Sequence, residues 1–411
     1  MEKKNDSAKV VEFIKKYAMV IIFAVVLTFF TIATKGIILS PVNVSNIISQ
    51  NAYVFVLATG MLLCILTGGN IDLSVGSVVC FVGAIGAKLM IDVGVPWPVA
   101  VLIMFSIGTL IGATQAFWIA YVRIPPFIVT LAGMLMFRGL SNVVLNGLTV
   151  PIGAKVGFIK FFGGGADCYI PGPALAFITG QGDDAKKITL NIVCLIVGAL
   201  AVAIYLALQI LGRFKRIKKQ YEVEKLVPWI VKMVLISAVI IALTVLLSLH
   251  KGLPSVLIIV MIVIVIYSYI TNNTTTGRYF YAVGGNEKAT RLSGINTNKT
   301  FFLAYTNMGF LASLAGMITI ARYTSAQPTS GTNFEMDAIA SCFIGGASAY
   351  GGIGTVPGAI IGASLMGVIN LGMLLLGVGP DMQKVIKGGV LLFAVILDVI
   401  SKRGFKLLAK N

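Results

Sequence analysis

The stretch Thr67-Gly-Gly-Asn-Ile-Asp-Leu-Ser-Val-Gly-Ser-Val78 interrupts a long apolar region of the chain. Apolar runs of residues 52–68 and 71–91 flank it, and a run of roughly 20 apolar residues can cross a hydrocarbon core as a helix. Glycine permits close backbone approaches that a side chain would forbid, and a helix break at membrane depth is tolerated only where it is buried in protein or lines a water-filled cavity. The stretch therefore predicts a broken membrane helix beside a path for a solute.

The composition of the chain agrees with a membrane location. Of the 411 residues, 57% are hydrophobic and 11% are charged, which is too little polar material to cover a water-soluble particle. We interpret residues 1–411 as a single all-α, polytopic transmembrane permease domain, with about 10–12 transmembrane helices or half-helices. The expected segments are 17–34, 52–68, 71–91, 97–121, 125–146, 189–211, 228–249, 253–270, 301–321, 336–350, 355–376 and 383–400. The run 336–350 is short enough to be re-entrant.

The distribution of positive charge gives the orientation. The formal net charge is +17, but the basic residues gather at the ends of the expected spans, which argues against nucleic acid as a partner. With the amino terminus in the cytoplasm, 21 of the 32 lysines and arginines fall in cytoplasmic segments, so the positive-inside rule places both termini there. The same topology makes 147–188 an extracytoplasmic loop and 271–300 a cytoplasmic loop.

The sequence lacks the residues that several kinds of catalysis require. The only histidine, His250, stands at the end of a span, so neither a zinc-hydrolase pair nor a histidine-based triad can be assembled. The sequence has no Gly-Lys dipeptide and hence no P-loop for nucleotide phosphates. The five cysteines suggest no metal site. We expect a chain that is not an enzyme and binds no metal or cofactor, so that any ATP and Mg²⁺ are used by another subunit.

The polar residues around the first break are candidates for a translocation pathway: Asn70, Asp72, Ser74 and Ser77. Asp72 is acidic in a long apolar region, and two interpretations of it stay open. Its carboxylate either caps the following helix by accepting amide N–H groups of residues 73–75, or faces the pathway directly.

A second glycine-rich break, Ile344-Gly-Gly-Ala-Ser-Ala-Tyr-Gly-Gly-Ile-Gly-Thr-Val356, weakly echoes the first. Both breaks fall at the cytoplasmic side of a helix pair in the expected topology, which would make the two halves a weak internal parallel repeat. In a chain with 45 glycines, chance explains so short a match as well as common ancestry does. Gly345 and Gly346 join the candidate pathway residues.

Three charged residues stand inside or beside apolar segments. Arg138 lies deep in the span 125–146, where an arginine must snorkel, pair or face the protein interior. Glu335 and Asp337 open the short half-span opposite. The sequence leaves open whether either carboxylate is the partner of Arg138.

The cytoplasmic loop 271–300 contains a candidate short helix. Gly284, Gly285 and Asn286 predict a turn, after which residues from Glu287 to Ser293 can form two helical turns. From the pattern alone, the simpler interpretation is a solvated connector or an interfacial segment.

Five stretches together resemble the permeases of bacterial monosaccharide importers of the ATP-binding-cassette (ABC) class, and the similarity runs nearly end to end. They are Gly68-Gly-Asn-Ile-Asp-Leu-Ser-Val-Gly-Ser77, Arg123-Ile-Pro-Pro-Phe-Ile-Val-Thr-Leu-Ala-Gly133, Gly284-Gly-Asn-Glu-Lys-Ala-Thr-Arg-Leu-Ser-Gly-Ile295, the segment 336–355, and Gly379-Pro with Val385-Ile-Lys-Gly388. The family includes ribose, galactose, arabinose and xylose permeases. In its extended section 155–270 the chain is similar to the longer xylose and multiple-monosaccharide members.

The resemblance implies a multi-pass permease of the bacterial cytoplasmic (inner) membrane that moves a pentose or hexose inward. It also implies a second permease subunit, as a homodimer or a heterodimer, together with a pair of cytoplasmic ABC ATPases and an extracytoplasmic sugar-binding protein. Under this resemblance the loop 271–300 is a coupling loop, and its ATPase-coupling residues are Gly284, Gly285, Asn286, Glu287 and Arg291. The alternative from another class is an ion-gradient-driven secondary transporter of a small polar solute, with Asp72 as the proton or sodium carrier.

Overall fold

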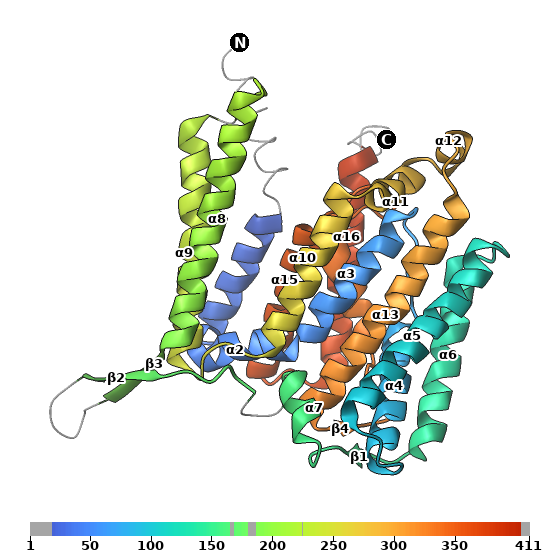
Figure 1. Cartoon of the computed structure of the whole chain (residues 1–411), viewed down its shortest axis with the longest axis horizontal. Helices are drawn as coiled ribbons and strands as arrows, with labels where there is room; N and C mark the ends of the chain where they lie inside the picture. The colour runs from blue at the N-terminus through green and yellow to red at the C-terminus, as the bar shows by residue number, and fades with distance from the viewer. Residues whose placement is uncertain (1–18, 165–167, 180–185, 224, 404–411) are drawn as a thin grey trace. The chain divides into compact units, whose positions relative to one another are not determined.

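The computed structural model describes residues 19–164, 168–179, 186–223 and 225–403, and they form an almost entirely helical protein (Figure 1). The described chain divides into two compact units. The first contains the residues up to 38, those from 47 to 168 and those from 256 onward. The second contains residues 39–46 and 169–255.

The helical elements, after an initial helix Met19–Ala33, are η1 (Ile37–Leu39), α2 (Pro41–Gln50), α3 (Ala52–Leu66), α4 (Val75–Ile91), α5 (Trp97–Ala120), α6 (Pro126–Leu145), α7 (Val156–Phe161), α8 (Ile192–Lys218), α9 (Leu226–Leu249), α10 (Val256–Asn273), α11 (Thr275–Gly285), α12 (Glu287–Leu292), α13 (Thr297–Tyr323), α14 (Phe334–Ile344), α15 (Val356–Leu375) and α16 (Pro380–Arg403). The strands are β1 (Val150–Pro151), β2 (Ala174–Thr179), β3 (Lys186–Asn191) and β4 (Ser325–Ala326).

Seven of the described helices are long and apolar enough to cross a membrane: α5, α6, α8, α9, α10, α13 and α15. The pair α2 and α3 gives an eighth if it is one broken span, and Met19–Ala33 and α4 are shorter apolar helices. The expected class, an all-helical polytopic membrane protein, is confirmed.

Helix α3 is the core of the first unit. Every residue of α3 except Tyr53 is buried, because the helix is apolar on all sides and α10, α11, α13, α14 and α15 pack around it (Figure 1). Helix α13 packs along both α3 and α5. Where it meets α5, Gly309 leaves no room for a Cβ against Gly108 and Gly112, and small residues of this kind let membrane helices approach closely.

Two of the expected spans are shorter than the hydropathy pattern predicts. The run 336–350 is helix α14, whose 11 residues rise about 16 Å, so it is a half-span followed by the non-helical segment 345–355. The run expected from 71 becomes helical only at Val75, because Gly68 and Gly69 adopt positive φ angles of 123° and 75° and the chain stays non-helical to the start of α4. Helix α14 ends at a break and α4 begins after one, and a hydropathy average smooths over both breaks.

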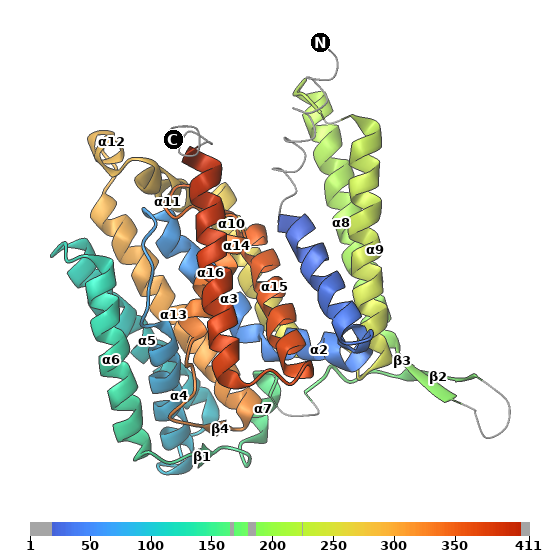
Figure 2. The ribbon, with the colours of Figure 1, turned by 180° about the vertical axis from the view of Figure 1, so that it is seen from behind.

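The two ends of the first unit carry different elements. Figure 2 shows α11 and α12 at the end where α16 finishes, and α7, β1 and β4 at the opposite end. At that opposite end β1 pairs with β4 in an antiparallel ladder, with Val150 opposite Ala326. The loops that follow α6 and α13 are thereby joined.

The second unit consists chiefly of two hairpins. Helices α8 and α9 pack side by side, and strands β2 and β3 pair antiparallel from Ala174 opposite Asn191 to Thr179 opposite Lys186. The sequence predicted 147–188 as an extracytoplasmic loop and assigned no strand to it. The structure adds a hairpin there, because Ala174–Thr179 pairs with Lys186–Asn191. Residues 180–185, between the two strands, lie outside the described residues.

Candidate translocation and coupling site

Asp72 organises the first break from a buried position. The side chain is 2% exposed, and its Oδ1 accepts two hydrogen bonds from Ser74, one from the backbone N–H at 2.8 Å and one from the hydroxyl at 2.7 Å. Ser74 is the N-cap residue of α4 and makes no side-chain cap of its own. The carboxylate thus takes an amide group in the range 73–75, as the capping interpretation requires, and an aspartate before a helix amino terminus is electrostatically favourable.

Ser74 links this turn to helix α5 through Gln115. The Ser74 hydroxyl lies 3.1 Å from Gln115 Oε1 and 3.0 Å from Gln115 Nε2, and the Gln115 side chain is buried. The sequence analysis did not identify Gln115. The sequence could have indicated Gln115, because a lone amide side chain inside the apolar run 97–121 must find a hydrogen-bond partner in the protein interior.

Ser77 lies one turn further, where α4 meets the start of α14. Within the part of the chain that the structure describes, its buried hydroxyl has no hydrogen-bond partner, and neither has Glu335 Oε2. Gly76 packs directly against Glu335 and the backbone of Gly331. Buried polar atoms are rarely left unsatisfied, so this region has hydrogen-bonding capacity to offer.

Asp337 has a partner that the sequence did not suggest. Lys387 of α16 forms an ion pair with its carboxylate, with Nζ 2.9 Å from Oδ1, and the Tyr53 hydroxyl donates to Oδ2 at 2.7 Å. Asp337 is 1% exposed and Lys387 is 15% exposed at the side chain. The Tyr53 ring stacks on Phe334. The half-helix α14 is therefore fixed to both α3 and α16.

Arg138 binds backbone rather than a carboxylate. Its Nη1 donates to the carbonyl oxygen of Pro328 at 3.2 Å and to that of Ser330 at 2.7 Å. These carbonyls belong to the segment between β4 and α14, so the arginine side chain of α6 holds the entry to the half-helix. The sequence left open whether Glu335 or Asp337 is the partner of Arg138, and the structure shows backbone carbonyl groups in that place.

The second break lies in backbone contact with the first. The N–H of Gly352 donates to the carbonyl oxygen of Leu66 at 3.1 Å, and Gly351 packs against Gly68. A Cβ on Gly69 would overlap the carbonyl oxygen of Ala349. The two breaks are therefore neighbours at one end of the first unit, on the side of α11. Gly345 lies away from this contact, against the backbone of Gly358, and Gly346 has a positive φ of 81°.

Gly284 of α11 completes this contact, which we call the glycine junction (Gly68, Gly69, Gly284, Gly351 and Gly352). A Cβ on Gly284 would overlap the carbonyl oxygen of Leu66 and crowd the Gly352 nitrogen, whereas a Cβ on Gly285 would meet nothing within 4 Å. The turn predicted at Gly284, Gly285 and Asn286 is confined to Asn286. Both glycines end helix α11, and the chain bends at Asn286, whose φ is −162°. Close packing, not turn geometry, explains Gly284.

Helix α12 follows at once and is fixed at its start. The Asn286 side chain caps it by accepting the Ala289 N–H at 3.0 Å. Glu287 pairs with Arg123 at 2.7 Å and accepts a hydrogen bond from Thr297 at 3.2 Å. Arg123 also bonds the side chain of Asn298. Glu287 therefore ties α12 to the α5–α6 loop and to the start of α13, and does not pair with Arg291.

The far end of α12 is exposed. Leu292 is 90% exposed, and Arg291 beside it is exposed as well. A single exposed leucine is ordinary on a protein surface, but here it stands at the open end of a short helix whose start is fixed by Asn286 and Glu287, so this end is free to contact a partner.

One cavity is lined both by a residue predicted for the translocation pathway and by residues predicted for ATPase coupling. A space of about 460 Å³ is lined by Asn70 of the first break, by Arg123 to Pro126, and by the residues from Val283 to Glu287. Its lining is mixed, with the Asn70 amide and the Arg123–Glu287 pair beside apolar side chains such as Phe301. Asn70 and the coupling residues 284–287 therefore share one surface, to which Arg291 does not contribute, whereas Asp72, Ser74 and Ser77 are buried.

Comparisons with known proteins show the family of the chain. The family described as the permease component of branched-chain amino acid transport systems matches residues 43–395. The xylose transport system permease protein of Haemophilus influenzae is 35% identical over 388 residues, covering 94% of this chain and 96% of that protein. The xylose permease of Escherichia coli K12 is 34% identical (94% and 92%), and its ribose import permease protein is also 34% identical (93% and 91%). No solved structure matches the chain.

Proposed function

This chain belongs to the family of permease components of branched-chain amino acid and monosaccharide ABC transporters, and we propose that its own cargo is a monosaccharide of the xylose or ribose kind. It is the non-catalytic, multi-pass transmembrane subunit of an ABC sugar importer. The observation that carries the choice of cargo is the likeness to xylose and ribose permeases over more than nine-tenths of the chain.

We assign the two soluble partners to opposite sides of the membrane. A cytoplasmic ATPase, which binds ATP and Mg²⁺, contacts the exposed end of α12 at Arg291 and Leu292. An extracytoplasmic sugar-binding protein contacts the loop 147–188, and two copies of the permease pack around a common path. The count of 21 of the 32 lysines and arginines in the cytoplasmic segments expected from the sequence supports this orientation, with both termini in the cytoplasm of a bacterium.

The glycine junction supports a direct mechanism of coupling. A movement of α12 passes to α11 through Asn286 and reaches Leu66 and Gly352 through Gly284 without an intervening side chain. Packed backbones transmit displacement because they cannot be compressed. The ATPase thereby moves both breaks together and switches the path between outward and inward access.

The path itself needs only weak polar contacts. A neutral sugar must enter and leave, so small and polar groups that bind its hydroxyls briefly serve better than a tight site. Asn70 in the cavity and the unpartnered oxygens of Ser77 and Glu335 are suitable groups. Asp72 has a positioning role here, since Ser74 already engages its carboxylate.

Reconstitution in liposomes tests the proposal. With the ATPase and the binding protein added, uptake of xylose or ribose should require ATP and should ignore imposed proton or sodium gradients. Uptake driven by a gradient without the ATPase would instead establish the ion-coupled alternative with Asp72 as carrier.

A further inference from the structure

The cavity beside the Arg123–Glu287 pair is enclosed by three separate parts of the chain. Residues 67, 68 and 70 of the first break form one wall, residues 283–287 at the junction of α11 and α12 form another, and residues 123–126 of the loop between α5 and α6 form a third. The coupling movement passes through the first two walls, so it alters the shape of the cavity. The volume of about 460 Å³ lies within the range of about 300–1,000 Å³ that is usual for small-molecule sites.

The polar groups of this cavity keep hydrogen-bonding capacity for a ligand. Asn70 Nδ2 donates one hydrogen bond to the carbonyl oxygen of Thr67 at 3.3 Å, which leaves its second N–H and its Oδ1. Glu287 uses the single oxygen Oε1 for both Arg123 and Thr297, which leaves Oε2. The side chains of Arg123 and Glu287 are 41% and 38% exposed, so a ligand can reach the pair. Because a positive and a negative group stand side by side, the cavity favours a neutral ligand that both donates and accepts hydrogen bonds.

Apolar side chains complete the lining of the cavity, among them Ile119, Ile124 and Phe301. A monosaccharide ring presents hydroxyl groups at its edge and C–H groups on its faces. It therefore needs a site that combines apolar walls with a few polar groups, and the cavity has both.

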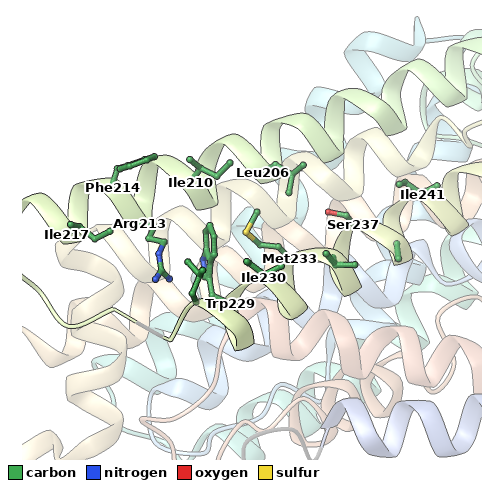
Figure 3. Close-up of a pocket in the computed structure, with 13 residues that line it drawn as sticks. Leu206, Ile210, Arg213, Phe214, Ile217, Trp229, Ile230, Met233, Ser237 and Ile241 are labelled. Carbon is green, nitrogen blue, oxygen red and sulfur yellow. The ribbon is translucent and has the colours of Figure 1, made fainter.

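A larger groove between α8 and α9 does not suit a sugar. Its volume is about 740 Å³, and Figure 3 shows Leu206 and Ile210 of α8 facing Ile230 and Met233 of α9 across it. The lining is chiefly apolar, so a sugar there would lose hydrogen bonds that its hydroxyl groups make with water. The mixed cavity beside the Arg123–Glu287 pair is the better match.

We propose that this cavity binds the transported monosaccharide from the cytoplasm and thereby slows further import. The inference rests on the proposed function, which makes a monosaccharide the cargo and places α12 on the cytoplasmic side. A ligand shifts an equilibrium between two states only by the difference in its affinity for them. A sugar that bonds both Asn70 and Glu287 bridges the first break and α12, so it fits the present arrangement best. It thus holds the permease in this state and opposes the switch that ATP drives.

Reconstitution with the cytoplasmic side facing outward tests the proposal. Vesicles enclose the binding protein and labelled xylose, with ribose in a parallel set, and ATP and the unlabelled sugar are added outside. Only complexes whose ATPase faces outward then transport. Saturating outside sugar should lower the initial rate of ATP-driven transport at least about fivefold, which is the lower end of usual allosteric couplings. Glycine betaine at the same osmolarity should leave the rate unchanged.

Three variants separate the cavity from the rest of the path. Ile124→Trp should fill the cavity and remove the inhibition. Val122→Trp is the matched control, because Val122 is two positions away, is 46% exposed and does not line the cavity, so the inhibition should persist. Asn70→Val keeps the shape of the side chain but loses its hydrogen-bonding groups, and it should raise the half-inhibitory sugar concentration about tenfold. Each variant is compared with its own rate in the absence of outside sugar.

Transport that ignores outside sugar would overturn this inference and leave the proposed cargo intact. Equal inhibition of Ile124→Trp, Asn70→Val and Val122→Trp would also overturn it, because the sugar would then act by re-entering the path without using the cavity. Saturation-transfer NMR of xylose with the purified permease–ATPase complex requires no transport, and it should show weaker binding to the first two variants than to Val122→Trp. Absence of ATP-driven transport of either sugar by the unsubstituted chain would refute the proposed cargo and this inference with it.

Discussion

The backbone N–H of Gly352 donates a hydrogen bond of 3.1 Å to the carbonyl oxygen of Leu66. Leu66 is the last residue of α3, and the carbonyl groups at a helix end have no partner inside the helix. The second break thus satisfies the end of the helix that precedes the first break. Gly284 packs over both atoms, so three segments distant in the sequence share one contact.

Transport should depend less on the charge of Asp72 than on its ability to accept hydrogen bonds. Asp72→Asn keeps an oxygen that can accept from the Ser74 N–H and hydroxyl, whereas Asp72→Leu leaves the buried Ser74 N–H unsatisfied, at about 1–3 kcal/mol, and leaves Gln115 as the acceptor for the hydroxyl. We expect the asparagine variant to retain most of its sugar uptake and the leucine variant to lose it, measured per amount of protein in the membrane. Equal and complete loss at normal membrane levels would require a charged role for Asp72.

The buried Asp337–Lys387 pair should matter far more than its exposed neighbour. Lys387→Met leaves a carboxylate that is 1% exposed without its cation, which typically costs about 3–5 kcal/mol. Lys384→Met is the matched control on the same helix, because the side chains of the Lys384–Asp381 pair are 56% and 97% exposed and such pairs contribute about 0–1 kcal/mol. Thermal unfolding of the purified proteins should separate the two. Similar unfolding temperatures would refute the role of Lys387 in fixing α14.

Leu292 should be needed for binding of the ATPase. Leu292→Asp places a charge on the exposed end of α12 without touching the core, so the permease should insert normally and fail to co-purify with the ATPase. Leu148→Asp changes a leucine that is 68% exposed at the opposite end of the first unit and should leave the complex intact. Intact complexes with both variants would place the ATPase contact elsewhere.

The two loops should label from opposite sides of the membrane. The described cysteines, Cys64, Cys80, Cys168, Cys194 and Cys342, are all buried, so an introduced cysteine should dominate labelling by an impermeant thiol reagent. Asp183→Cys should react in intact cells, and Lys288→Cys should react only after the membrane is broken. The reverse pattern would invert the proposed topology.

The sequence predicted the elements that depend on local composition. Long apolar runs became helices because a backbone in the bilayer must satisfy its own hydrogen bonds, and the short run 336–350 became the half-helix α14. Helix α2 was missed because Asn43, Ser45 and Asn46 make it too polar for a hydropathy search.

The candidate site was only partly predictable, because its contacts join residues far apart in the chain. Asp72 and Ser74 lie two positions apart, and their capping contact was foreseeable. The partners Arg123 and Glu287 lie 164 positions apart, and Asp337 and Lys387 lie 50 apart, so no local pattern specifies either pair. Gly284 was interpreted as a turn residue, because the contact with Leu66 and Gly352 that requires a glycine there belongs to the tertiary structure.

The most direct test of the coupling account compares Gly284→Ala with Gly285→Ala. The added methyl group at Gly284 meets the backbone of Leu66 and Gly352, whereas at Gly285 it meets open space. Overpacking costs about 1–3 kcal/mol, so Gly284→Ala should lower ATP-driven sugar uptake by roughly tenfold while the ATPase still binds. Gly285→Ala should transport normally. Equal uptake by the two variants at equal membrane levels would contradict a coupling path through the glycine junction.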